Sequence, residues 1–133
     1  LRLLGLIHQQ LTTKEGVMTG HPHAESILKG INYMEENYSR KITVPELAEL
    51  VMLTPKYYGT VFKEATGQTI AEYLLRLRMK KAKQLLAGNR FSVQEVADQV
   101  GIGDIHYFSK IFKKLEGLPP KRYAASVSWP QRR

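Results

Sequence analysis

Hydrophobic positions recur every three or four residues through most of the chain, which is the spacing of the buried face of a helix. In residues 23–39 one such face holds Ile27, Ile31, Met34 and Tyr38. Residues 70–86 contain no glycine or proline and are rich in strong helix formers, so they predict a single long helix. The pattern as a whole is typical of an all-α protein.

A segment of the chain occurs twice, at a shift of about fifty residues. Residues 43–53 (TVPELAELVML) align with residues 92–102 (SVQEVADQVGI), and after one inserted residue 54–73 align with 104–123. The alignment pairs Tyr58 with Phe108 and Phe62 with Phe112, all on the apolar faces of their helices, so these four are predicted to be core residues. One structural unit is therefore predicted to occur twice.

Each copy predicts two short helices joined by a tight turn. Thr43 and Ser92 occupy N-cap positions, and each is followed three residues later by a glutamate, as in a capping box. Thr54 and Asp104 can cap the second helix of each copy, which ends at a glycine. Two short helices, a tight turn and an exposed side on the second helix together indicate a helix-turn-helix.

The predicted fold is all-α, with about seven helices in two helix-turn-helix subdomains joined by a connecting helix. Residues 23–68 form the first subdomain, 69–87 the connecting helix, 88–124 the second subdomain and 125–133 a basic tail. Residues 1–22 hold a short amphipathic run, and the sequence GHPH at residues 20–23 separates that run from the rest of the chain. We interpret them as the trailing end of an upstream regulatory domain and a linker, in preference to an intrinsic element.

The positive charge is concentrated in the later part of the chain. The net charge is +8, and residues 54–133 hold fifteen basic and six acidic side chains, against five and six in residues 1–53. A polyanion, nucleic acid first and an anionic membrane surface second, is favoured over a merely solvated basic face. A lipid-binding helix needs exposed aromatic or leucine side chains, and here the repeated cores use the aromatic residues, so no membrane partner is predicted.

The sequence holds no pattern that indicates catalysis. Cysteine is absent, which removes thiolate metal sites and cysteine nucleophiles. The four histidines lack carboxylates in a zinc-ligand spacing, and neither a phosphate-cradling glycine loop nor a Ser/His/Asp arrangement is present. No apolar run reaches the eighteen or so residues needed to cross a bilayer. We therefore expect neither an enzyme nor a metal or cofactor site, and a cytoplasmic location.

Two long segments of the chain resemble the DNA-binding region of AraC/XylS transcription regulators. These segments are VPELAELVMLTPKYYGTVFKEATGQTIAEYLLRLRMKKAKQLL and VADQVGIGDIHYFSKIFKKLEGLPPKRY. The resemblance covers both halves in the family's order and spacing. It implies a bacterial transcription regulator, with an activator favoured, whose two recognition helices enter successive major grooves of double-stranded DNA. It also implies an effector bound by an upstream domain, and RNA polymerase as a further partner. The alternative is a basic module that binds RNA or binds nucleic acid without sequence preference.

Outward positions early in each second helix are the candidates for contact with base edges. Residues one turn deeper, and the helix starts, are predicted to contact phosphates. Relatives often carry larger side chains where this chain has Gly59 and Thr60, so the first helix is the weaker candidate reader. The candidate base contacts are Lys56, Gly59, Thr60, His106, Tyr107, Ser109 and Lys110, and the candidate phosphate contacts are Thr54, Lys63, Asp104, Lys113 and Lys114.

Not every basic side chain of the connecting helix can face the DNA. Arg78 shares a side of that helix with Leu75, Ala82 and Leu85, which are core-like residues. We therefore predict a structural role for Arg78.

Overall fold

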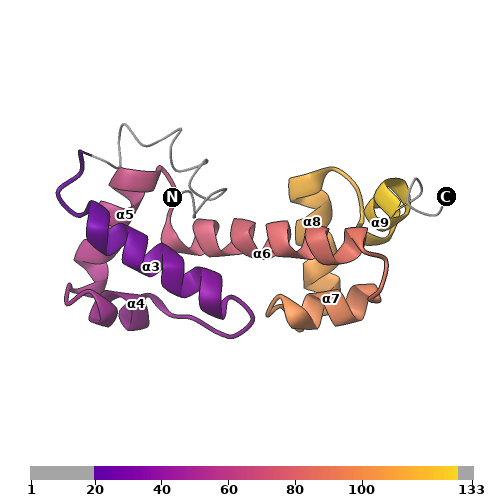
Figure 1. Cartoon of the computed structure of the whole chain (residues 1–133), viewed down its shortest axis with the longest axis horizontal. Coiled ribbons are helices and arrows are strands. Elements are labelled where there is room, and N and C mark those ends of the chain that lie inside the picture. Colours follow the sequence, from indigo (N-terminus) through magenta and orange to yellow (C-terminus); the bar gives the residue numbers. More distant parts are fainter. Residues whose placement is uncertain (1–19, 129–133) are drawn as a thin grey trace. The chain divides into compact units, whose positions relative to one another are not determined.

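The computed structural model describes residues 20–128, and every regular element among them is a helix. This confirms the all-α fold (Figure 1). Most of the expected upstream segment, residues 1–19, and the end of the basic tail, residues 129–133, lie outside the described residues. The described helices are α3 (Ala24–Asn37), α4 (Val44–Leu50), α5 (Pro55–Thr66), α6 (Ile70–Ala87), α7 (Val93–Gln99), α8 (Ile105–Glu116) and α9 (Pro120–Ser128).

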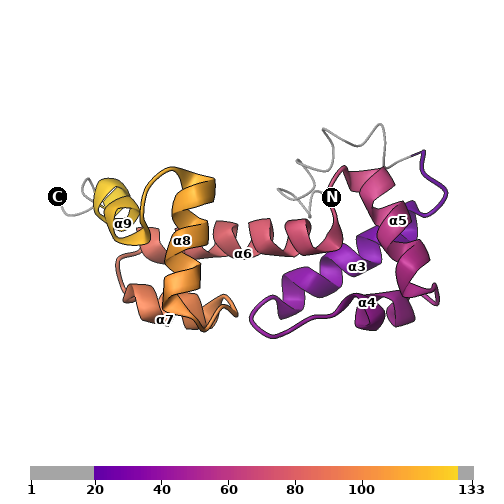
Figure 2. The ribbon, with the colours of Figure 1, turned by 180° about the vertical axis from the view of Figure 1, so that it is seen from behind.

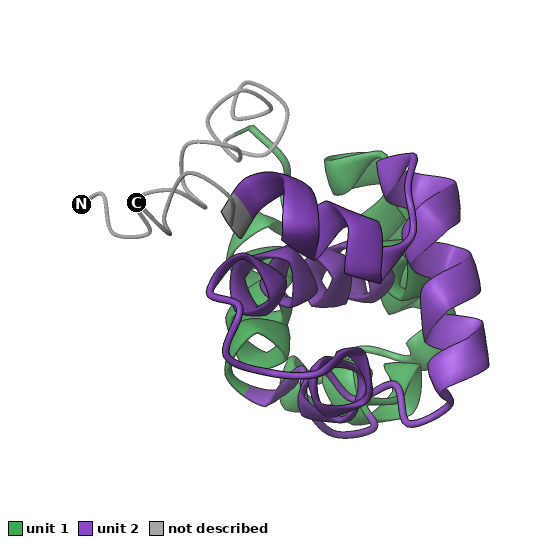
Figure 3. Ribbon diagram, turned by 90° about the vertical axis from the view of Figure 1, so that its right-hand side faces the viewer, with its two compact units in different colours: residues 1–36, 42–73 green, residues 37–41, 74–133 purple. Residues whose placement is uncertain are grey.

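These helices form two compact units (Figure 3). Unit 1 contains the described residues 20–36 and 42–73, and unit 2 contains residues 37–41 and 74–128. The division falls inside α6, whose first turn belongs to unit 1 and whose remainder belongs to unit 2. Each unit thus holds one of the two helix-turn-helix pairs, α4 with α5 and α7 with α8.

Both helix-turn-helix pairs begin with the capping boxes that the sequence predicts. The Glu46 amide donates to Thr43 Oγ1 at 3.2 Å, and the Thr43 amide donates to Glu46 Oε1 at 3.2 Å. The same two bonds join Ser92 and Glu95, at 3.1 and 2.8 Å. Each box satisfies two amides that would have no partner at a helix start, so the beginning of each pair is fixed by local sequence.

The second helix of each pair ends at a glycine with a left-handed backbone. Gly67 has φ 81° and Gly117 has φ 93°, and their amides donate to the carbonyls of Lys63 and Lys113. Glycine adopts this conformation without steric cost, whereas a residue with a Cβ is strained there. The predicted ends of these two helices are therefore confirmed.

The core of unit 1 is built around Tyr58 and Phe62, which are fully buried. The Tyr58 hydroxyl donates to the carbonyl of Ser26 in α3 at 3.1 Å. A side-chain carbon at Gly30 would collide with that hydroxyl, so glycine at this position is what allows the tyrosine to fit. Burial raises the pKa of Tyr58 to about 12, because the phenolate would be poorly solvated.

The core of unit 2 joins three helices. Met79, Ala82 and Leu86 of α6 pack with residues of α7 and with Phe108 and Phe112 of α8. Figure 2 shows α8 running across the later part of α6, with α7 beside the start of α8. The rings of Phe112 and Tyr123, the latter from α9, meet edge to face with centroids 5.6 Å apart.

Arg78 holds the segment Asn37–Lys41 in unit 2. Its Nε donates to the carbonyl of Tyr38 at 2.9 Å, and one terminal nitrogen donates to the carbonyl of Arg40 at 2.8 Å. Burial lowers the pKa of the Arg78 guanidinium, because the charged form loses solvation. The structural role predicted for this arginine is confirmed.

Gly101→Ala is expected to destabilise unit 2. Gly101 has φ 86°, and an added Cβ would lie 2.7 Å from the Tyr38 carbonyl oxygen and 3.1 Å from backbone atoms of Ser39. The left-handed backbone costs a residue with a Cβ about 1–2 kcal/mol, and overpacking against backbone adds roughly 1–3 kcal/mol. Urea unfolding measures the change in the free energy of unfolding.

Gly103→Ala is the matched control, because an added Cβ at Gly103 meets nothing within 4 Å. We expect a change within about 0.5 kcal/mol, as for an ordinary surface substitution. Equal losses of stability in the two variants would contradict the close approach of residues 38–39 to Gly101.

Candidate nucleic-acid interface

The exposed side of α5 is defined by the residues that the helix buries. Tyr58, Val61, Phe62, Ala65 and Thr66 face the core of unit 1. The opposite side carries the candidate base contacts and one candidate phosphate contact from the sequence. Lys56, Thr60 and Lys63 are exposed, and Gly59 is half-buried.

A groove of about 780 Å³ runs along this side of α5. Most of its surface is apolar, and the α5 residues Lys56, Gly59, Thr60, Lys63 and Glu64 line it. Its other walls come from the start of α4, the start of α5 and the start of α6. These wall residues are Val44, Pro55, Thr69, Ile70 and Ala71.

Two of the lining residues, Gly59 and Thr60, determine what the groove offers to a partner. The Thr60 hydroxyl donates to the carbonyl of Lys56 one helical turn earlier, at 3.1 Å. A Cβ added at Gly59 would meet nothing within 4 Å, so the space beside the helix is open at this point.

The corresponding side of α8 in unit 2 carries more polar and basic groups. His106, Tyr107 and Lys110 are exposed, and Ser109 is half-buried. Lys113 and Lys114 lie one turn further along, both exposed. In the repeat, Ser109 corresponds to Gly59, Lys110 to Thr60 and Lys114 to Glu64.

The two helices therefore differ in charge. The exposed side of α5 has two lysines and one glutamate, whereas that of α8 has three lysines and a histidine. The acidic residue at the end of α8, Glu116, forms an ion pair with Lys83 of α6 at 3.0 Å. Unit 2 thus presents the stronger positive field to an anionic partner.

Thr54 and Asp104 act as N-caps. Thr54 Oγ1 accepts from the amide of Tyr57 at 3.2 Å. Asp104 Oδ1 accepts from the amides of His106 and Tyr107, at 2.9 and 3.1 Å. Their contact with phosphates remains a prediction, and these three amides are already bonded within the chain.

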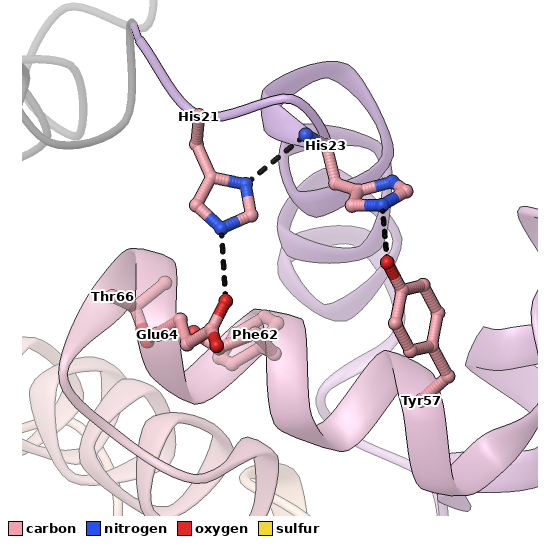
Figure 4. A network of polar contacts seen from close by, with 6 residues as sticks. All are labelled: His21, His23, Tyr57, Phe62, Glu64 and Thr66. Atoms are coloured by element: carbon pink, nitrogen blue, oxygen red, sulfur yellow. Dashed lines mark hydrogen bonds and ion pairs between the residues drawn. The ribbon is translucent and has the colours of Figure 1, made fainter.

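A histidine pair ahead of α3 contacts the flank of α5 (Figure 4). His21 Nε2 lies 3.4 Å from Glu64 Oε1, and His23 Nε2 lies 3.0 Å from the Tyr57 hydroxyl. His21 Nδ1 accepts from the His23 amide at 3.0 Å, so the ring proton of a neutral His21 resides on Nε2 and points toward Glu64.

Sequence reasoning interpreted HPH as a linker and missed these contacts. No local pattern joins His21 to Glu64 or His23 to Tyr57, which are 43 and 34 residues apart. The one available signal is the spacing of Tyr57 and Glu64, which puts them on one side of a helix.

The described residues hold no cluster of histidine, aspartate and glutamate that could bind a metal ion. Within residues 20–128, no helix is both long enough and apolar enough to cross a membrane.

A helix-turn-helix domain family model matches residues 47–126. The raffinose operon transcriptional regulatory protein RafR of Pediococcus pentosaceus is 36% identical over 97 residues, which are 73% of this chain and 35% of RafR. The C-terminal domain of the two-component response regulator yesN from Fusobacterium nucleatum is 38% identical, with a TM-score of 0.68, over 71% of this chain and 93% of that chain.

A further solved structure, the DNA-binding domain of the global transcriptional factor AdpA with a target DNA, has a TM-score of 0.75 at 21% identity. It covers 80% of this chain and 96% of that chain, and the likeness shows the fold. The chain spans about a third of the length of curated relatives such as RafR. From the family match and these relatives, the chain belongs to the helix-turn-helix domain family, among the DNA-binding domains of AraC/XylS-type transcription regulators.

Proposed function

We propose that this chain binds double-stranded DNA with sequence preference, as the DNA-binding part of a bacterial transcription regulator. The observation that carries the proposal is the repeated geometry of α5 and α8. In each unit the second helix of the pair buries its aromatic side and exposes a side that bears lysines. A helix exposed in this way fits the major groove of DNA, and lysines neutralise phosphates.

In this proposal the two helices enter successive major grooves. Lys56, Gly59 and Thr60 of α5 face base edges in one groove, and His106, Tyr107, Ser109 and Lys110 of α8 face them in the next. Lys63, Lys113 and Lys114 lie deeper along their helices and contact phosphates, together with the helix starts at Thr54 and Asp104.

The alternative is a basic module that binds RNA, or binds any nucleic acid without sequence preference. Selection of bound sequences from a pool of random DNA duplexes distinguishes the proposal from this alternative. We expect the chain to enrich a single duplex sequence, and to bind it more tightly than an unrelated duplex or a single-stranded RNA of equal length. Equal affinity for all three would contradict the proposal, because phosphate attraction alone carries no sequence information.

The relatives support a proposal for the wider role of the regulator. RafR is named as the regulator of an operon, and only about a third of it aligns with this chain. We propose that effector binding resides in a domain outside the matched region, that the regulator acts in the cytoplasm where bacterial DNA lies, and that it activates transcription through contact with RNA polymerase. The chain itself acts by binding and not by catalysis.

Lys110→Ala is expected to weaken binding to the selected duplex by about 1–3 kcal/mol and to relax base preference at one position. Thr60→Ala is expected to cost less, because the Thr60 hydroxyl already donates to the Lys56 carbonyl. Both residues are exposed, so neither change disturbs a core. Titration of each variant with every single-base variant of the duplex measures the effects. A larger loss for Thr60→Ala would contradict this order.

A further inference from the structure

The exposed side of α5 offers few hydrogen-bond donors to a base. The single proton of the Thr60 hydroxyl is used within the helix, at 3.1 Å from the Lys56 carbonyl oxygen. Gly59 contributes no side chain, and Glu64 can only accept when ionised. Among the α5 residues that line the groove, only Lys56 and Lys63 can therefore donate a side-chain hydrogen bond to a base.

What this side does offer is an apolar surface in a groove. Pro55, Val44 and Ala71 contribute carbon to the walls, and the open space at Gly59 lets a partner approach the helix backbone. Lys56 and Lys63 line the same groove. Their positive charges complement a DNA backbone, while their methylene stems can lie along apolar surface.

Only one group on the major-groove edges of the bases matches such a surface. Thymine carries a C5-methyl group there, whereas the other base edges present hydrogen-bond donors and acceptors. With its hydroxyl proton committed to the helix, Thr60 has its methyl group as the apolar part that can meet a base.

We infer that unit 1 recognises thymine through its C5-methyl group, with the Thr60 methyl group and the surface beside Gly59 as the contact. This inference rests on the proposed function, because it requires α5 to lie in a major groove. It makes Thr60 a specificity-determining residue. Recognition by α5 is then apolar, whereas α8 has Ser109 and Lys110 at the positions of Gly59 and Thr60, which can hydrogen-bond to base edges.

Deoxyuridine supplies the test, because it differs from thymidine only by the missing C5-methyl group. The duplex enriched by selection is synthesised with deoxyuridine in place of each thymidine in turn, and its affinity for the whole chain is measured. We expect at least one replacement to weaken binding by about three- to fivefold, the factor that corresponds to burial of one methyl group. Replacements outside the two contacted grooves serve as the control.

Two variants identify the partner of that methyl group. Thr60→Ser keeps the hydroxyl and removes the methyl group, whereas Thr60→Val keeps a methyl group at that place and removes the hydroxyl. We expect the thymidine-to-deoxyuridine affinity ratio at the sensitive position to fall to about one in Thr60→Ser. The ratio is expected to persist in Thr60→Val. A merely structural role of Thr60 would change the affinity for both duplexes alike and leave the ratio unchanged.

Two outcomes would overturn the inference while duplex binding stands. In one, no deoxyuridine replacement weakens binding to the selected duplex. In the other, a replacement weakens binding equally in the wild-type chain and in Thr60→Ser, which would place the methyl contact elsewhere. Failure of the selection to enrich any duplex would instead contradict the proposed function, and the methyl contact with it.

Discussion

Binding of the chain to duplex DNA is expected to weaken by about 10³- to 10⁵-fold when the salt concentration rises from about 50 to about 200 mM. Residues 54–133 hold fifteen basic side chains, and α5 and α8 expose five lysines on the proposed contact sides. The fifteen basic side chains together allow about six to ten phosphate contacts, and each contact releases bound counterions from the DNA. Fluorescence anisotropy of a labelled duplex over a salt series measures how the logarithm of the binding constant falls with the logarithm of the salt concentration. The slope of that line is called the salt slope below.

Single lysine variants test whether the proposed interface is the source of the salt slope. Lys113→Ala and Lys114→Ala should each reduce the slope by about one, with little change in base preference. Lys29→Ala is the matched control, since Lys29 is exposed on α3 outside the proposed contact sides, and its slope should equal that of the wild-type chain. An affinity that barely changes with salt would contradict the electrostatic argument. An equal reduction of the slope in Lys29→Ala would mean that phosphates also contact the chain outside the proposed contact sides.

Phe112→Ala is expected to lower the free energy of unfolding of unit 2 by about 3–5 kcal/mol. The Phe112 side chain is 0% exposed, and its ring lies 5.8 Å from that of Phe108 and 5.6 Å from that of Tyr123, between centroids. Truncation removes these contacts and leaves a cavity that the surrounding helices cannot fill completely. Urea unfolding followed by circular dichroism gives the change.

Tyr107→Ala is the control for Phe112→Ala on the same helix. Tyr107 is 47% exposed on the opposite side of α8, so its loss should change stability by less than about 0.5 kcal/mol while weakening binding to the selected duplex. The two variants thus separate the core side of α8 from its contact side. Comparable destabilisation by both would contradict the orientation of α8 in the structure.

The helix boundaries were predictable because local sequence determines them. The capping boxes at Thr43 and Ser92 involve residues three positions apart, and the ends at Gly67 and Gly117 depend on one residue's backbone freedom. Apolar spacing within each helix also fixed its buried side. For that reason the sequence alone placed Lys56 and Lys110 on exposed sides, although their contact with bases stays a prediction.

Contacts between residues far apart in the chain were not predictable in the same way. The repeat predicts two units. It does not predict that residues 37–41 belong to unit 2, or that Arg78 donates hydrogen bonds to the carbonyls of Tyr38 and Arg40. The pairing of His21 with Glu64 depends likewise on where α3 and α5 pack. The groove on α5 depends on how α4 and the start of α6 flank that helix. No spacing within a single helix encodes any of these arrangements.

Backbone amide chemical shifts, recorded while the selected duplex is added to the chain, test most directly whether α5 and α8 form a DNA interface. We expect the largest changes at residues of α5 around Lys56–Lys63 and of α8 around His106–Lys113, with small changes at exposed residues of α3 such as Lys29. An unrelated duplex should give smaller changes at the same residues. Largest changes on α3, or identical changes with both duplexes, would contradict sequence-specific binding through these two helices.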